Sequence, residues 1–303
     1  MQADLSLPRF SDVPVQGGQL RVASWGTGPR TVLGVHGITG SCMQLAPVAR
    51  LLDEDVRIVV PDLRGRGASN DLPGPYGILN HAADCAAVVE NFTDGPVVAL
   101  GESLGGFVSV VLAATRPDLV ERLVLADGGL PTPVPSGLDP DELIRAVIGP
   151  AIDRLDLLFP SLEAYLDFWR EHPAVSEEWN EDVECYLEYD LEPTEGGFRS
   201  RARKEAVHQD GIDVLAGHEL IARTLETVSC PVTLVRACRN LVNEEPPLYP
   251  DAVVGDWKSR LPGLGDELVT DTNHYTLMFG TCGAKALAAH VLAAGDRGGS
   301  ADG

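Results

Sequence analysis

The segment that most constrains this chain is residues 101–105, Gly-Glu-Ser-Leu-Gly, because it joins a predicted strand to a predicted helix. Residues 95–100 form a short apolar, β-branched run, which is typical of a buried strand. Residues 106–114 form an apolar helical stretch that ends near Pro117. Ser103 therefore lies at a strand–turn–helix corner, where the backbone lifts a serine hydroxyl above the sheet.

The glycines around Ser103 suit such a corner. Gly101 and Gly105 leave room for the tight turn, and Gly106 lets the helix pack closely behind it. The free N–H groups at the start of the helix face the serine and favour a developing negative charge there. The pentapeptide alone also arises by chance, but this context favours Ser103 as a catalytic nucleophile over an ordinary turn serine.

Short β-branched runs alternate with helical patterns along most of the chain. This alternation predicts an α/β fold with a mostly parallel central sheet flanked by helices. The predicted strands are residues 20–25, 30–35, 56–60, 95–100, 120–126, 230–237 and 267–270, and the predicted helices are residues 43–52, 80–91, 106–114 and 282–293.

Strand patterns disappear between Leu130 and about Val228, where prolines, acidic residues and helical patterns dominate. We therefore predict a helical cap, inserted into the core and covering Ser103. The predicted division is a core in two parts (residues 1–130 and 229–294), a helical cap (residues 131–228) and a disordered tail (residues 295–303).

The chain has 303 residues and a formal net charge of −22, from 23 basic and 45 acidic residues. This charge opposes binding to nucleic acid and to anionic membranes, and it disfavours a highly anionic substrate. No apolar run is long enough to cross a bilayer, and residues 1–8 lack the pattern of a signal peptide. Six cysteines without C-x-x-C spacing indicate reduced, mostly buried thiols, so we expect a cytoplasmic protein. The oligomeric state stays open, a homo-oligomer included.

No motif predicts a cofactor or a metal. The glycines of residues 101–106 lack the spacing and the downstream acid of a dinucleotide site, and no histidine or cysteine pair has metal-ligand spacing. The acidic residues between Glu177 and Glu195 predict a solvated helix face rather than a metal or partner site. We therefore expect chemistry that uses side chains alone.

A serine nucleophile needs a base, an acid that orients the base, and donors for the oxyanion. His274 follows the last predicted strand directly, so its loop is expected at the same edge of the sheet as Ser103. The other histidines fall in a turn (His36), in predicted helices (His81, His290) or in the predicted cap (His172, His208, His218). We predict that His274 is the base.

The glycine-rich turn at residues 36–40, His-Gly-Ile-Thr-Gly, follows another predicted strand. Such a turn can aim backbone N–H groups inward, and we predict Ile38 N–H and Leu104 N–H as the two oxyanion donors. An ordinary strand–helix turn is the alternative for residues 36–40.

Together these motifs resemble the α/β-hydrolase fold superfamily, in particular its lid-bearing serine esterases and lactone hydrolases. The resemblance covers residues 15–291, and its carriers are H-G-I-T-G at 36–40, D-L-R-G-R-G at 62–67, G-E-S-L-G-G at 101–106 and N-H-Y at 273–275. It implies that Ser103 is the nucleophile, that His274 acts first as general base and then as general acid, and that Ile38 and Leu104 form the oxyanion hole. It also places Arg64 and Arg66 near the pocket mouth, where we expect structural roles.

The acid departs from the pattern that the resemblance implies. Members of the superfamily usually carry an aspartate just after the strand represented here by residues 232–237, and the matching position is the amide Asn240. Asp127, at the end of the preceding predicted strand, is the acid that we favour. Glu244 is the alternative, followed by Glu245 and by a weakened or absent acid.

The resulting expectation is a cofactor-independent hydrolase that cleaves a carboxylic ester or lactone of a hydrophobic small molecule through an acyl-enzyme. The cap offers Leu157, Leu158, Phe159, Tyr165, Phe168, Trp169 and Trp179, mostly as cap core with some lining the pocket. A C–C bond hydrolase, a thioesterase or an acyltransferase would use the same groups. A non-catalytic small-molecule receptor of the same fold is the alternative outside enzymes.

Overall fold

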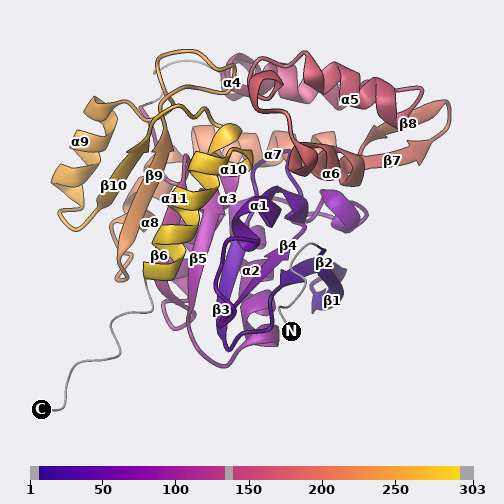
Figure 1. Ribbon diagram of the computed structural model, residues 1–303. Helices are drawn as coiled ribbons and strands as arrows, with labels where there is room; N and C mark the ends of the chain where they lie inside the picture. The colour runs from indigo at the N-terminus through magenta and orange to yellow at the C-terminus, as the bar shows by residue number, and fades with distance from the viewer. Residues whose placement is uncertain (1–6, 134–138, 294–303) are drawn as a thin grey trace, which may run out of the picture.

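The computed structural model describes residues 7–133 and 139–293. Eight strands form one sheet in the order β1-β2-β4-β3-β5-β6-β9-β10 (Figure 1). The strands are β1 (Arg9–Val15), β2 (Gly18–Trp25), β3 (Arg30–Val35), β4 (Val56–Pro61), β5 (Val97–Glu102), β6 (Val120–Ala126), β9 (Val232–Ala237) and β10 (Gly265–Val269). The pairs from β4 through β10 are parallel, whereas β1 and β2 are joined antiparallel to that edge. The predicted α/β class with a mostly parallel sheet is confirmed.

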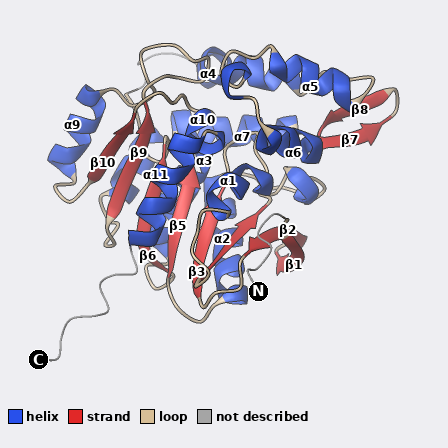
Figure 2. Ribbon diagram, viewed as in Figure 1, coloured by secondary structure: helices blue, strands red, loops and turns tan. Residues whose placement is uncertain are grey.

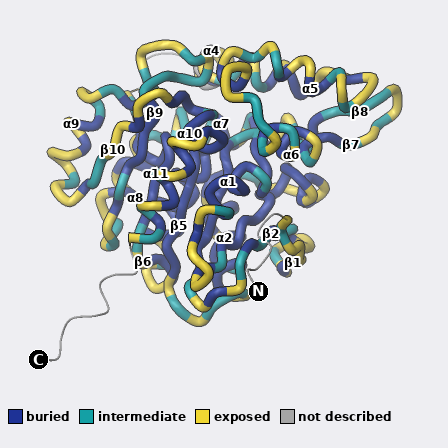
Figure 3. Tube along the Cα trace, in the orientation of Figure 1, coloured by how far each residue is buried: buried dark blue, intermediate teal, exposed yellow. Residues whose placement is uncertain are grey.

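Helices cover both faces of this sheet (Figure 2). One layer holds α2 (Ile78–Phe92), α3 (Leu104–Thr115), α8 (His218–Leu225) and α9 (Asp251–Arg260), and the other holds η1 (Cys42–Leu45), α1 (Ala46–Ala49), α10 (Thr276–Phe279) and α11 (Thr281–Leu292). In β3, Leu33 and Val35 pack into the first layer while Val32 packs into the second, because successive side chains of a strand alternate between faces. The central strands are therefore buried on both sides (Figure 3).

The segment between β6 and β9 contains the predicted helical insertion. It holds α4 (Pro140–Arg154), α5 (Leu162–Arg170), η3 (Ser176–Glu178), α6 (Glu181–Asp190), β7 (Leu191–Thr194), β8 (Gly197–Ser200), α7 (Lys204–Ala216) and α8. Figure 1 shows α4, α5, α6 and the β7–β8 hairpin beyond the carboxyl ends of the central strands. The exception is α8, which packs on α3 in the sheet-covering layer although it falls within residues 131–228.

The structure corrects several details of the sequence-based expectations. The insertion contains a hairpin, β7–β8, whose tight turn uses Gly196 and Gly197 at φ 91° and 148° and whose four-residue strands are too short to show an alternating pattern. Strand β1 and helices α9 and α10 were not predicted. Of the six cysteines, only Cys42 and Cys85 are buried, so the expectation of mostly buried thiols is wrong. The predicted disordered tail lies outside the described residues.

Candidate functional site

Ser103 lies between β5 and α3 with φ 51° and ψ −117°, a conformation that a non-glycine residue rarely adopts. The neighbouring glycines permit this turn because other backbone segments occupy the space where a Cβ would lie. A Cβ on Gly101 would lie 2.3 Å from the Gly105 oxygen, and a Cβ on Gly105 would lie 2.1 Å from the Val35 oxygen. The chain therefore folds into the sharp corner that the glycine spacing predicts.

His274 lies in the loop between β10 and α10, and its Nδ1 is 2.7 Å from Asp127 Oδ2. Asp127 follows β6 at φ 45°, and its other oxygen accepts a hydrogen bond from the Ala237 N–H of the adjacent strand β9 at 3.3 Å. Both side chains are buried. Burial lowers the pKa of His274, but the hydrogen bond that His274 donates to Asp127 and the charges of Glu102 and Asp127 outweigh it, so the net effect raises that pKa.

The other imidazole nitrogen, His274 Nε2, lies 3.2 Å from Glu102 Oε1. Glu102 is the last residue of β5, and its second oxygen accepts a hydrogen bond from Gln44 Nε2 at 3.1 Å. Gln44 in turn accepts a hydrogen bond from Gly37 N at 3.1 Å. Burial is the main cause that raises the pKa of Glu102 to about 7. Within residues 7–133 and 139–293, no hydrogen bond joins the Ser103 hydroxyl to His274.

Sequence reasoning missed Glu102 and Gln44. Glu102 carried a usable signal, because it is a single carboxylate at the end of an otherwise apolar buried strand, next to the predicted nucleophile. A buried carboxylate requires a partner, and the nearest cationic group is His274. Gln44 has no such signal, because only the three-dimensional fold brings η1 beside β5.

The two residues predicted as oxyanion donors lie near Ser103. Ile38 and Leu104 both line the cavity that contains Ser103, and Leu104 is the first residue of α3, whose N–H has no partner within the helix. The Ile38 carbonyl accepts a hydrogen bond from Arg66 Nε at 3.0 Å, which helps to hold the backbone of this turn in place. Ile38 and Leu104 therefore stay the predicted oxyanion donors.

His36 supports the same turn. Its Nε2 accepts a hydrogen bond from Leu63 N at 3.0 Å, so Nδ1 carries the proton and donates to the Gly37 oxygen at 2.8 Å. Burial lowers the pKa of His36 to about 3, so the ring is neutral near pH 7. His36 is thus a structural residue of the turn.

The two arginines of the loop after β4 are buried and paired. Arg64 binds Asp84 of α2 with two contacts of 2.7 Å. Arg66 Nη2 lies 2.5 Å from Asp210 of α7, and both side chains are fully buried. Asp210 also contacts His81 Nε2 at 2.9 Å. Arg66 therefore connects the insertion to Ile38, in keeping with the structural role that we expected.

The structure separates the alternative acids from His274. Asn240 Oδ1 accepts hydrogen bonds from Val242 N and Glu244 N at 3.0 and 3.1 Å, so this amide stabilises its own turn. Glu244 and Glu245 are exposed, and neither contacts His274 among the described residues. Of the candidate carboxylates weighed from the sequence, Asp127 is the one that lies against the imidazole.

Ser103, His274 and Asp127 open into a cavity of about 180 Å³. Its apolar lining comes from Phe107, Val147, Ile148, Ala151, Val214, Leu215, Leu241 and Leu248, and its polar lining includes Gln44, Glu102, Tyr186, Tyr249 and Tyr275. None of the seven apolar and aromatic residues that the sequence suggested from the cap lines this cavity. Several of them pack against one another instead, as in the Phe159–Tyr165 ring contact at 4.8 Å.

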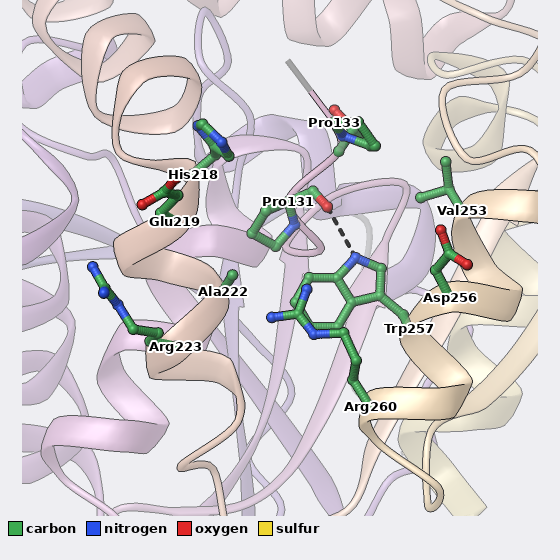
Figure 4. Close-up of a pocket in the computed structure, with 11 residues that line it drawn as sticks. Pro131, Pro133, His218, Glu219, Ala222, Arg223, Val253, Asp256, Trp257 and Arg260 are labelled. Atoms are coloured by element: carbon green, nitrogen blue, oxygen red, sulfur yellow. Dashed lines mark hydrogen bonds between the residues drawn. The ribbon is translucent and has the colours of Figure 1, made fainter. Parts of the chain in front are cut away.

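A second cleft, of about 360 Å³, lies between α8 and α9 (Figure 4). Trp257 forms part of its wall, donates a hydrogen bond to the Pro131 oxygen at 2.9 Å and carries the Arg260 guanidinium 4.0 Å from its ring centre. The cleft contains none of the predicted catalytic residues, and Thr132 is the residue that lines both hollows. We therefore place the candidate active site in the smaller cavity.

In the part of the chain that the structure describes, no group of three or more histidine, cysteine, aspartate or glutamate residues is arranged to hold a metal ion. Nor does any helix there have the length and apolar character needed to span a membrane.

Comparison with known proteins gives consistent matches. A family model described as the alpha/beta hydrolase fold matches residues 30–150. Lipase LipV of Mycobacterium tuberculosis is 42% identical over 109 residues. The match covers 36% of this chain, which spans 41% of the length of that lipase. The 2-(acetamidomethylene)succinate hydrolase of Mesorhizobium japonicum is 27% identical over 277 residues, which cover 91% of this chain and 92% of the relative.

Among solved structures, the thioesterase domain from the curacin biosynthetic pathway superposes with a TM-score of 0.74. The superposition covers 94% of this chain and 99% of the domain at 21% sequence identity. At this identity the likeness supports the fold and carries no statement about the substrate.

Proposed function

The chain belongs to the α/β-hydrolase fold superfamily, and from that premise we propose that it is a serine hydrolase of carboxylic esters or lactones. Hydrolysis itself agrees with the names of the relatives, a lipase and a 2-(acetamidomethylene)succinate hydrolase. The observation that carries the finer proposal is the 2.7 Å contact between His274 Nδ1 and Asp127 Oδ2, beside a serine held at φ 51°. A base oriented by a carboxylate next to such a serine is the arrangement that activates a hydroxyl nucleophile.

In the proposed acylation step, Ser103 Oγ attacks the substrate carbonyl carbon and its proton passes to His274 Nε2. The carbonyl oxygen gains the negative charge, which Ile38 N–H and Leu104 N–H stabilise. Asp127 holds the proton on Nδ1, so Nε2 is the nitrogen that carries the free electron pair. When the tetrahedral intermediate collapses, the carbon–oxygen bond to the leaving group breaks, and the departing alkoxide takes the proton from Nε2.

Deacylation repeats the same steps with water. His274 Nε2 removes a proton from a water molecule, and the resulting oxygen attacks the acyl carbon of the Ser103 ester. Collapse releases the carboxylic acid and returns the proton to Ser103 Oγ. Neither step consumes a cofactor, because the proton shuttles between His274 and the oxygen atoms alone.

The cavity supports an uncharged, largely apolar substrate. Its walls are mainly aliphatic, and the chain's net charge of −22 disfavours approach of anions. Glu102 contacts His274 and Gln44 contacts Glu102, so these two lining residues put polar groups next to the proposed base, and we call this region the polar end. We propose a hydrophobic acyl or lactone portion against the aliphatic walls and the reacting carbonyl at the polar end.

The test is hydrolysis of p-nitrophenyl butyrate by the wild type and three variants. We expect Ser103→Ala to fall to the background rate and Asp127→Asn to lose about 10³–10⁴-fold in kcat/KM, because the amide favours the wrong imidazole tautomer. Glu244→Gln is the matched control, since it removes an exposed carboxylate that is distant from the imidazole, and its rate should stay within about twofold of the wild type. A large loss in Glu244→Gln together with a small loss in Asp127→Asn would overturn the assignment of the acid.

A further inference from the structure

His274 lies between two carboxyl groups. Asp127 contacts Nδ1 at 2.7 Å, and Glu102 contacts Nε2 at 3.2 Å. A Ser–His–Asp arrangement accounts for the first carboxyl group and leaves the second without a role. The Glu102 contact is made at Nε2, which is the nitrogen that must accept the proton of Ser103.

Glu102 is held in place rather than free to move into solvent. Its side chain is 2% exposed, and Gln44 Nε2 donates to its second oxygen at 3.1 Å. No lysine or arginine within residues 7–133 and 139–293 forms an ion pair with Glu102, so the imidazolium of His274 is its cationic partner there. The carboxyl group is therefore paired with the group whose protonation state controls catalysis.

The other titratable groups around this pair do not supply a positive charge. Asp127 approaches from the end of β6, Tyr186 from α6, and Tyr275 from the loop after β10. His36, in the turn after β3, is neutral because burial lowers its pKa to about 3. The positive charge of Arg154 in α4 acts on the pKa values of Tyr186 and Tyr275, which it lowers against the effect of burial. The proton balance of His274 is thus set mainly by two carboxyl groups.

The Glu102 carboxylate affects His274 as a base in two ways. A negative carboxylate next to Nε2 stabilises the imidazolium, so His274 stays protonated up to a higher pH than with Asp127 alone. The same carboxylate makes His274 a stronger base once its proton has been lost, because it stabilises the imidazolium that forms when Ser103 is deprotonated. Because the two groups interact strongly, they titrate as a pair.

We propose that Glu102 is a positioning residue for His274: its carboxyl group holds Nε2 in the resting enzyme and sets the pH at which the imidazole becomes a free base. This inference rests on the proposed serine-hydrolase function. It makes the site a four-residue arrangement, in which Asp127 fixes the tautomer and Glu102 adjusts the strength of the base.

The test measures how fast a fluorophosphonate probe labels Ser103, because this reaction needs His274 but no knowledge of the substrate. Rates are measured between about pH 6 and about pH 9 for the wild type and for Glu102→Gln, an isosteric change that removes the charge. We expect the ratio of the rate at about pH 6 to that at about pH 9 to rise by about 3- to 10-fold in Glu102→Gln. At about pH 9 the variant should label more slowly than the wild type, so the two profiles converge or cross.

Two further variants complete the design. Glu102→Asp withdraws the carboxyl group from Nε2 by one methylene. We expect its ratio of labelling rates at the two pH values to lie between those of the wild type and Glu102→Gln. This variant keeps the test decisive if Glu102→Gln fails to fold. Glu244→Gln removes an exposed carboxylate and should leave the ratio unchanged.

The outcomes separate this inference from the proposed function. Equal loss of rate at every pH in Glu102→Gln, or a wild-type ratio in a folded Glu102→Asp where the glutamine variant does not fold, would overturn the role of Glu102 and leave the serine hydrolase standing. If the wild type is not labelled, or if Ser103→Ala is labelled equally well, the proposed function itself fails.

Discussion

At the residue scale, the proposed acid, Asp127, lies at the end of β6 and not after β9, where we expected relatives of this fold to carry it. Asp127 takes a positive φ of 45° at the end of β6 and is anchored by Ala237 N–H, which aims its second oxygen at His274. Asn240, at the position where relatives of this fold were expected to carry the acid, accepts two backbone N–H groups of its own loop. The Asp127 side chain is therefore oriented toward His274, whereas the Asn240 side chain is bound to its own loop.

A charge at position 240 should not replace Asp127. We expect Asn240→Asp to keep kcat/KM within about threefold of the wild type, because the new carboxylate would stay bound to the N–H groups of Val242 and Glu244. The double variant Asp127→Asn/Asn240→Asp should be as slow as Asp127→Asn alone in p-nitrophenyl ester hydrolysis. Recovery of most of the lost activity in the double variant would contradict this assignment.

Local sequence pattern was sufficient to predict where Ser103 and His274 lie relative to the sheet. Ser103 directly follows β5 and His274 lies in the loop after β10, and parallel strands bring their carboxyl ends to one edge of the sheet. Asp127 was favoured on the same ground, with Glu244 left open. Glu102 was missed because its role depends on a side-chain contact across two elements, which neither spacing nor periodicity encodes.

At the element scale, the insertion is joined to the core by buried charge. Asp210 of α7 contacts Arg66 and His81 and accepts the Gly77 N–H at 2.8 Å. Burial raises the pKa of Asp210, but the charges of Arg66 and His81 outweigh it and the net effect lowers that pKa. Since Arg66 also donates a hydrogen bond to the Ile38 oxygen, this contact links α7 to the turn that carries the proposed oxyanion donor Ile38.

Removing the Asp210 charge should therefore be costly. We expect Asp210→Asn to lower the free energy of unfolding by about 3–5 kcal/mol, because it leaves the Arg66 guanidinium buried without a counter-charge. Asp213→Asn is the matched control on the same helix, where the side chain accepts the Ile78 N–H at the start of α2, and its cost should be about 0.5–2 kcal/mol. Urea denaturation measures both, and equal losses would contradict a special role for the buried pair.

The elements predicted best are those with a strong hydrophobic period. Strand β6 matches its predicted range, and α2 and α11 differ from theirs by one or two residues at their ends. The β7–β8 hairpin was missed because Pro193 and charged residues interrupt any alternation in strands of four residues. The aliphatic residues that line the cavity, such as Val147, Ile148 and Val214, were also missed, because their positions depend on how the insertion helices pack against the sheet rather than on composition.

At the scale of the whole molecule, the dominant property is a net charge of −22. The many acidic side chains repel one another in the folded state. Salt screens this repulsion, because the Debye length falls from about 30 Å at about 10 mM salt to about 8 Å at about 150 mM. We therefore expect the Tm to rise when NaCl is raised over this range, measured by circular dichroism. KCl is the control for specific-ion effects and should act equally, whereas a fall in Tm with both salts would contradict the argument.

The proposed function requires that Ser103 forms the acyl-enzyme. The most direct measurement is intact-mass spectrometry of the wild type quenched during turnover of a p-nitrophenyl ester, followed by peptide mapping. We expect a mass gain equal to one acyl group, located on the peptide that contains Ser103 and absent from Ser103→Ala. Turnover without an adduct on Ser103 in samples quenched during the first turnover, or an adduct that persists in Ser103→Ala, would contradict it.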